Sequence, residues 1–333
     1  HASFRRYWLA GFLATFATMI VAVAVGWQIY DLTRDPFDLG LIGLIQFAPS
    51  LLLVLVTGQV ADRFGRRAIT ALSMLVEAGC AVALVVLTLR GLSGPAPVFA
   101  VLLVFGIARA FMRPAASALL VNVGPEQSFA YAVAWNSSSW QLASVLGPVA
   151  GGLIYGLGAE IAYGLAALML FVASVLTFAI PRPKKRAGIE RPSLQSLIAG
   201  FRYIWHEKVV FGAISLDLFA VLLGGAVALL PVFARDILEL GPWGLGLLRA
   251  APGIGAVAMA VWLSGTPFRD NAGMIMLVCV GLFGAFTALF GLSTVAWLSI
   301  LMLALGGGCD MVSVFVRNTL IQMWTPDNLR GRV

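Results

Sequence analysis

Ten apolar stretches, each 20 residues or longer, alternate along the chain with polar segments. A helical stretch of that length crosses a hydrocarbon core about 30 Å thick. The pattern therefore predicts an all-α polytopic membrane protein. Its expected spans are Tyr7–Tyr30, Leu39–Ala61, Ala68–Leu89, Val98–Val121, Phe129–Leu157, Ile161–Ile180, Val209–Ala234, Trp243–Gly265, Ala272–Leu292 and Val295–Met323.

Composition excludes most other classes of protein. Of the 333 residues, 60% are hydrophobic and 11% are charged, whereas soluble domains carry roughly 25% charged residues. All three cysteines, Cys80, Cys279 and Cys309, fall inside expected spans, which argues against a disulfide scaffold. The chain contains no HExxH, GxSxG or GxxxxGK[ST] motif. We therefore expect no enzyme activity, no cofactor and no metal site.

Positive charge is unevenly distributed over the expected loops. If the N-terminus is cytoplasmic, 15 of the 22 Lys and Arg residues fall in cytoplasmic segments and only three in outer segments. Short cytoplasmic loops carry such an excess in membrane proteins. The charge thus predicts a membrane protein with a cytoplasmic N-terminus, and it requires no nucleic-acid partner.

The two halves of the chain share a repeated sequence. The segment GLIQFAP at 43–49 recurs as GLLRAAP at 246–252, an offset of 203 residues, and Arg113 and Arg317 are 204 residues apart. The register holds from the second to the fourth span of each half. Parallel repeats of about six spans each are a known transporter architecture.

The repeat also predicts the domain organisation. We expect an N-terminal six-helix bundle over 1–180, a basic linker over 181–208 and an incomplete, four-helix C-terminal bundle over 209–333. The linker has the spacing of an amphipathic helix, which would lie on the membrane surface or pack on the bundle. By the offset, the chain is truncated after the tenth helix of a protein about 60–70 residues longer. A natural ten-span protein is the alternative.

The loop after the second span carries a compact charge motif, GQVADRFGRR at 58–67. A positive cytoplasmic loop would explain its arginines, but not an acid and a glycine at this spacing. The motif resembles the signature loop of the major facilitator superfamily. That resemblance implies a two-bundle fold, with about ten of twelve helices present, and alternating access. It also assigns a role in conformational change to Gly58, Asp62, Arg63, Gly65, Arg66 and Arg67.

Further segments extend the resemblance, among them WQIYDLT at 27–33, RAFMRPAA at 109–116 and PDNLRGRV at 326–333. They are similar to the branch that contains the enterobactin exporter and macrolide efflux proteins. This implies proton-coupled export of a bulky amphipathic molecule, siderophore- or drug-like, by a monomer in contact with lipid. Substrate identity does not follow from fold. Proton-coupled uptake of a small nutrient and a non-transporting sensor or scaffold remain alternatives.

A glycine-proline element lies in the fifth span. Gly147, Pro148, Gly151 and Gly152 resemble the corresponding element of drug–proton antiporters, although Ala143 stands where that pattern has glycine. Proline removes a helix hydrogen bond, and glycine permits close backbone contact. An antiport role and simple helix packing are both open.

Charged residues inside spans are costly and usually functional. The superfamily fold implied by the resemblance places Asp217, Asp310 and Arg109 in or near its central cavity. A carboxylate that responds to burial and to a nearby cation can carry a proton. We predict that Asp217 and Asp310 couple to protons, with Arg109 as counter-charge. Static ion pairs between helices are the alternative.

Other polar residues in the spans receive weaker assignments. Arg113 and Arg317, at equivalent positions of the repeat, are predicted to act in gating or to reach lipid headgroups. Glu77, on the third span, is predicted to be structural. A substrate cavity or, alternatively, hydrogen bonding between helices is predicted for Gln28, Gln46, Asn136, Ser137, Trp140 and Gln141.

Overall fold

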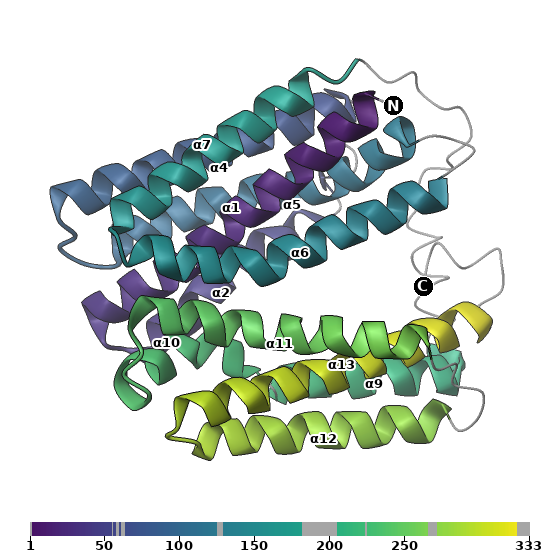
Figure 1. Ribbon diagram of the computed structural model, residues 1–333. Coiled ribbons are helices and arrows are strands. Elements are labelled where there is room, and N and C mark those ends of the chain that lie inside the picture. Colours follow the sequence, from purple (N-terminus) through teal and green to yellow (C-terminus); the bar gives the residue numbers. More distant parts are fainter. Residues whose placement is uncertain are drawn as a thin grey trace. The chain divides into compact units, whose positions relative to one another are not determined.

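The computed structural model describes residues 2–54, 56–57, 60, 64–124, 129–181, 205–223, 225–265 and 272–324. Helices account for nearly all of them, and no strand occurs in these ranges, so the all-α prediction is confirmed (Figure 1). The elements are α1 (Ala2–Thr33), α2 (Pro36–Leu52), α4 (Arg66–Arg90), α5 (Ala96–Val123), α6 (Phe129–Tyr155), α7 (Ala159–Phe178), α9 (Lys208–Leu223), η2 (Gly225–Leu229), α10 (Leu230–Val232), η3 (Phe233–Ile237), α11 (Gly241–Ser264), α12 (Ala272–Leu292) and α13 (Ala296–Trp324).

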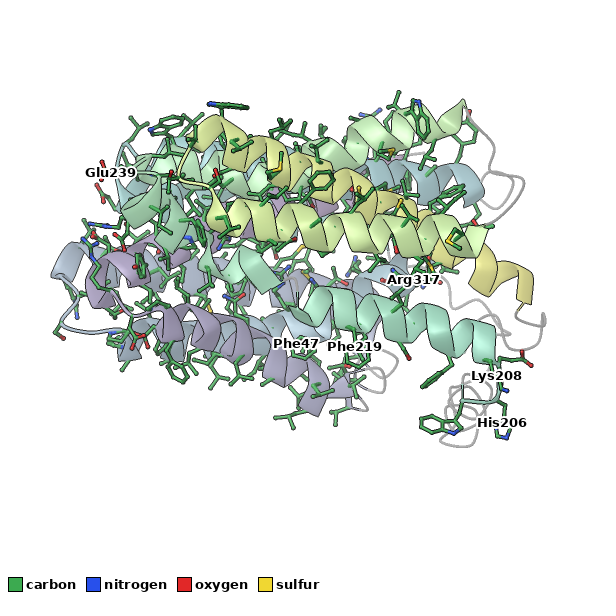
Figure 2. The ribbon with its side chains drawn as sticks, turned by 90° about the horizontal axis from the view of Figure 1, so that it is seen from below. Phe47, His206, Lys208, Phe219, Glu239 and Arg317 are labelled. Carbon is green, nitrogen blue, oxygen red and sulfur yellow. The ribbon has the colours of Figure 1, made fainter. Side chains whose placement is uncertain are left out.

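Seven helices in the described part of the chain are long and apolar enough to cross a membrane: α1, α4, α5, α7, α11, α12 and α13. The apolar α2 is shorter, at 17 residues. Many large apolar side chains on these helices face away from the protein; Leu52 and Leu292 are 78% and 81% exposed. Phe47 and Phe219 are likewise exposed (Figure 2). Lipid is the solvent that such surfaces require.

The second span begins earlier than its hydrophobic pattern predicts. The Asp35 side chain accepts a hydrogen bond from the Phe37 N–H at 2.8 Å, and Pro36 occupies the first turn of α2. An acidic N-cap followed by proline favours a helix start. The helix ends at Leu52, where the Leu53 N–H donates to the Pro49 carbonyl, so the span predicted over Leu39–Ala61 is not one continuous α-helix.

The seventh predicted span, Val209–Ala234, is also wrong as a continuous helix. The α9 helix ends at Leu223 and is followed by the 3-10 turn η2, the short α10 and the π-helix η3. Consecutive glycines at 224 and 225 weaken a helix, and Pro231 cannot donate a backbone hydrogen bond. The apolar pattern continues through this region, but the backbone changes its hydrogen bonding three times.

The chain divides into two compact units: residues 1–186 with 228–250, and residues 187–227 with 251–333. The domain boundaries predicted from the repeat stay a prediction for the complete fold. The amphipathic helix expected in the linker lies outside the described residues. Figure 2 shows His206 and Lys208 where the described chain resumes at the start of α9.

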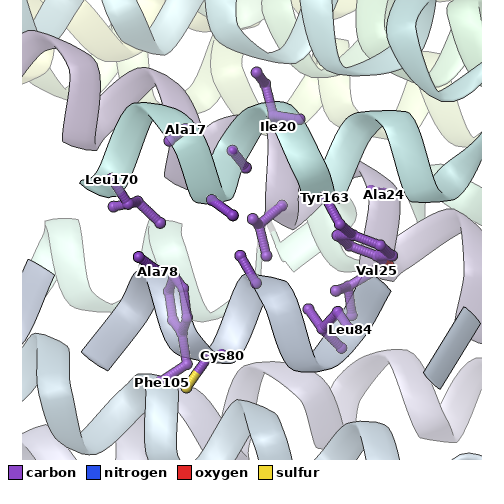
Figure 3. Packing of buried hydrophobic residues seen from close by; sticks show 14 of the residues in the cluster. Ala17, Ile20, Ala24, Val25, Ala78, Cys80, Leu84, Phe105, Tyr163 and Leu170 are labelled. Atoms are coloured by element: carbon purple, nitrogen blue, oxygen red, sulfur yellow. The ribbon is translucent and has the colours of Figure 1, made fainter. Parts of the chain in front are cut away.

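In the first unit, α1 packs on α6 and α7, α4 packs on α5 and α7, and α2 packs on α5. Alanine is the commonest residue in their shared core (Figure 3), and Ala17, Ala24, Ala81 and Ala166 are fully buried. Small side chains let helix backbones approach closely, which is how helices associate in lipid. Tyr163, also fully buried, fills the space between α1, α4 and α7.

Glycine sets the helix crossings in both units. In the first unit, a Cβ on Gly106 of α5 would lie 2.9 Å from the Gln46 carbonyl oxygen of α2. In the second unit, a Cβ on Gly307 of α13 would lie 2.1 Å from the Pro252 carbonyl oxygen of α11. The helices α2 and α11 carry the repeated segment, so the two copies pack through the same kind of contact.

These crossings predict the effect of adding one methyl group. Gly307→Ala should lower the free energy of unfolding by about 1–3 kcal/mol, because α11 and α13 must move apart. Gly281→Ala on α12 is the matched control, since no atom lies within 4 Å of its added Cβ. It should be neutral or stabilising by about 0.5–1 kcal/mol. Thermal unfolding of both variants in detergent measures the difference, and equal midpoints would contradict the packing shown here.

Candidate functional site

The glycine-proline element of α6 is packed on two sides. Toward α1, a Cβ on Gly147 would lie 2.6 Å from Met19 Cβ, and one on Gly151 would lie 3.0 Å from Ile20 Cα. These two glycines are four residues apart, so they share one face of the helix. Only residues without a side chain allow α6 to lie this close to α1.

The same element also contacts the first turns of α11. A Cβ on Gly152 would lie 2.5 Å from the Pro242 carbonyl oxygen, and a Cβ on Gly246 would lie 2.5 Å from the Pro148 carbonyl oxygen. Close packing, one of the two interpretations left open by the sequence, is therefore present. An antiport role for the element stays a prediction.

Part of the signature loop is described, and it ties helix ends together. Gly65 adopts a φ of 91° before α4, a conformation that favours glycine. Arg66 donates to the Ala118 carbonyl at 3.3 Å and the Asn122 side chain at 3.4 Å, both in α5. Gly58, Asp62 and Arg63 lie outside the described residues.

Arg67 makes the corresponding contact with α7. Its guanidinium donates to the Phe178 carbonyl at 3.2 Å and to the Ile180 carbonyl at 2.7 Å. The last carbonyls of a helix lack partners within the helix, and the negative end of the helix dipole attracts a cation. The two arginines thus join the start of α4 to the ends of α5 and α7.

A second charged cluster joins α1 to η3 within the first unit; we call it the α1–η3 network. Asp31 pairs with Arg235, and Arg34 Nη1 lies 3.0 Å from Asp236 Oδ1. The Tyr30 hydroxyl donates to the other oxygen of Asp236. The Arg235 guanidinium also lies over the Trp27 ring, 5.4 Å from its centre. Two acids and two bases therefore balance each other.

Local backbone geometry places these charges. Arg34 directly follows the last residue of α1 and has a φ of 55°, and its N–H donates to the Tyr30 carbonyl at 3.0 Å. On the other side, Arg235 and Asp236 lie in the π-helix, a form that is rare and often found at functional sites. Sequence reasoning missed this network because its members are about 200 residues apart.

Glu77 of α4 has unusual surroundings. The residue is 0% exposed, and neither carboxylate oxygen has a hydrogen-bond partner. Arg109 and Arg113 of α5 act on it electrostatically, the first half-buried and the second exposed. A buried carboxylate that feels a cation is the environment predicted above for Asp217 and Asp310. The available signal was an acid in one apolar span and an arginine in the next.

The predicted cavity residues are dispersed. Gln28 accepts a hydrogen bond from the Tyr163 hydroxyl at 2.8 Å and donates to Thr88 Oγ1 at 3.0 Å, so its amide joins α1, α4 and α7. Gln46 is half-buried on α2. On α6, Asn136 and Gln141 are half-buried, whereas Ser137 and Trp140 are exposed. Gln28 thus serves hydrogen bonding between helices, the alternative given above.

In the second unit, Asp310 and Arg317 lie seven residues apart on α13, and both are half-buried (Figure 2 labels Arg317). Two turns of helix separate them along one side. The backbone of Asp217 belongs to α9, and its side chain lies outside the described residues. Within the described ranges, no group of three or more His, Cys, Asp or Glu residues could hold a metal ion.

Sequence comparison gives relatives along the whole chain. The profile of a family described as "Transmembrane secretion effector" matches residues 1–333. The enterobactin exporter EntS of Escherichia coli O1:K1 is 28% identical over 341 residues, covering 100% of this chain and 80% of the exporter. EntS of Shigella boydii serotype 18 is similar to the same extent.

Solved transporter structures share the fold. A bacterial homolog of the human lysosomal transporter Spinster, inward-facing and unoccupied, gives a TM-score of 0.75 at 14% identity, covering 99% of this chain and 76% of that chain. The nucleoside transporter NupG gives 0.69 at 14% identity, over 99% and 85% of the two chains. The POT family transporter PepTSo gives 0.70 at 11% identity, over the same shares. At these identities the likeness shows the fold alone.

The α1–η3 network predicts a measurable coupling between its members. In a double-mutant cycle, Asp31→Asn and Arg235→Met should show a coupling energy of about 0.5–1 kcal/mol in unfolding, the scale of a half-exposed ion pair. The cycle of Asp31→Asn with Arg90→Met, an exposed arginine at the end of α4, is the control and should be additive. Additivity in both cycles would contradict the pairing.

Proposed function

This chain belongs to the transmembrane secretion effector family of the major facilitator superfamily, and we propose that it exports a bulky amphipathic molecule in exchange for protons. Membership makes it an integral membrane transporter, since the family consists of transport proteins and not of enzymes. The family fold predicted from the sequence is therefore confirmed. Export, substrate class and proton coupling are the proposal.

The direction of transport and the substrate class are supported by the relatives. Those at 28% identity are named enterobactin exporters, and they match this chain from end to end. A siderophore-like or drug-like amphipathic molecule is the substrate class in keeping with them. The bacterial exporter relatives support an inner-membrane location, and the bias of Lys and Arg supports a cytoplasmic N-terminus.

The observation that carries proton coupling is the buried carboxylate of Glu77. An ionised carboxylate without hydrogen bonds is costly in an apolar interior, and protonation removes the charge. Arg109 and Arg113 act in the opposite sense, because they stabilise the ionised form. A shift of α5 relative to α4 would alter this balance and so take up or release a proton. Asp217 and Asp310 remain proposed proton carriers in the second half.

Alternating access requires contacts that hold one state and separate in another. We assign this role to the α1–η3 network. Its ion pairs are about half exposed, and such pairs contribute only about 0–1 kcal/mol each. They can therefore open reversibly. The close packing of α6 on α1 at its glycines, and the hydrogen bonds of Arg66 and Arg67 to the ends of α5 and α7, hold the helices of the first unit together. Arg113 and Arg317 retain the gating role proposed for them.

Glu77→Gln tests the proton step. The amide has the shape of the protonated acid but cannot release a proton, so exchange of substrate without a gradient should persist while proton-driven accumulation is lost. Both are measured in proteoliposomes holding the full chain, with enterobactin and ethidium as probes. Glu239→Gln, at an exposed loop position (Figure 2), is the matched control and should behave as the parent protein.

The same assay on Asp217→Asn and Asp310→Asn separates the candidates. Loss of proton-driven accumulation in either variant, with Glu77→Gln unaffected, would move the proton site to the second half. Undiminished accumulation in all three variants across several pH values would contradict carboxylate-based coupling.

A further inference from the structure

Arg249 of α11 is a half-buried charge that the proposed proton step does not use. Its Nε atom is enclosed and has no hydrogen-bond partner. Its Nη2 atom lies 3.1 Å from the position that a Cβ on Gly26 would occupy, so the guanidinium packs directly on the backbone of α1. Pro231 of α10 closes the same space, at 3.5 Å from that position.

No acidic group neutralises Arg249 within the described part of the chain. The α6 helix, which packs on the first turns of α11, contains no charged residue at all. The acids carried by α1 and η3 are Asp31 and Asp236, and both are engaged in the α1–η3 network. A half-buried cation that has no ion-pair partner and an enclosed, unbonded Nε is costly, so a role in stabilising the fold does not explain it.

The internal repeat shows that the fold does not need this charge. The aligned segments at 43–49 and 246–252 place Arg249 at the position of Gln46. In the first unit the neutral amide occupies that position on α2, and α2 still packs on α5. The cation is therefore a specific feature of the second copy, and Gly26 leaves room for it.

We propose that Arg249 binds the acidic group of an organic anion that this transporter carries. The guanidinium presents parallel donors that match the paired oxygens of a carboxylate, and such charge-assisted bonds are strong in a dry site. A bound anion would supply both the missing charge and the missing hydrogen-bond acceptors. The inference rests on the proposed function, because it names the substrate class of the same transporter.

Binding and transport are measured separately, with carboxyfluorescein as an anionic amphipathic probe and ethidium as a cationic one. Arg249→Met should weaken carboxyfluorescein binding to the purified full chain by about 10- to 100-fold, the scale of losing a hydrogen-bonded charge. Arg249→Lys should retain part of the affinity. Ethidium binding should not weaken in either variant. Arg90→Met, an exposed arginine, should leave both probes unaffected.

Two further measurements separate binding from a structural role. Arg249→Met should not lower the unfolding midpoint of the unliganded protein, since it removes a half-buried charge that has no ion-pair partner in the described residues. Gly26→Ala keeps the charge but crowds the guanidinium, and it should also weaken carboxyfluorescein binding. A large fall in the midpoint of Arg249→Met, or unchanged carboxyfluorescein affinity in that variant, would overturn the proposal.

The remaining outcomes distinguish this inference from the proposed function. Proton-driven transport of ethidium by a protein that does not bind carboxyfluorescein would leave the exporter standing and overturn the anion site. Arg249-dependent binding of carboxyfluorescein without transport of either dye would support the site and overturn the exporter. If chloride or inorganic phosphate binds at Arg249 and carboxyfluorescein does not compete, the site is one for inorganic anions and the substrate assignment is wrong.

Discussion

Close approach of helix backbones at small residues is the constraint on which this protein depends. Lipid is as apolar as leucine, so helices in a membrane gain little from burying apolar side chains against one another. Gly147 and Gly151 bring α6 onto α1, and Gly307 brings α13 onto α11. At each crossing, a side chain in place of the glycine hydrogen would clash with the neighbouring helix. The apolar side chains can therefore face outward over much of the molecule without loss of a defined fold.

Within that packed scaffold, charge is used in two ways. The α1–η3 network contains acids and bases in equal number and is partly open to solvent, so it can form and break at small cost. Glu77 is fully buried and Arg249 is half-buried with an enclosed Nε, and neither forms an ion pair in the described residues. Such groups reduce stability unless a proton or a ligand compensates them. For this reason Glu77 carries the proposed proton step and Arg249 the proposed anion site.

The sequence was sufficient for the fold class, because apolar length and glycine content depend on local composition. It also identified the family through the loop at 58–67. The breaks in the second and seventh predicted spans were missed, since hydropathy does not register a change from α to π hydrogen bonding at 233–237.

The candidate site was harder to predict than the fold. The partners of Asp31 and Asp236 lie about 200 residues away in the sequence, and no local pattern connects them. Glu77 was treated as structural because of its helix number, yet the arginine that acts on it lies one helix further along the chain. Gln28 has the polarity expected of a cavity residue, but its amide is used between helices. Polarity inside a span therefore identified candidates without showing which neighbour each one meets.

The internal repeat separates the demands of fold from those of function. Positions at which the two copies agree, such as Pro49 and Pro252 inside α2 and α11, belong to the shared architecture. Positions at which the two copies differ are not fixed by the shared architecture. In the aligned segments, the largest change of charge is from the amide of Gln46 to the guanidinium of Arg249. A duplicated bundle needs only one copy to recognise the substrate. The asymmetry between Gln46 and Arg249 is thus the expected result of duplication followed by specialisation. One copy retains a neutral side chain, and the other has a charge that no described residue around it balances.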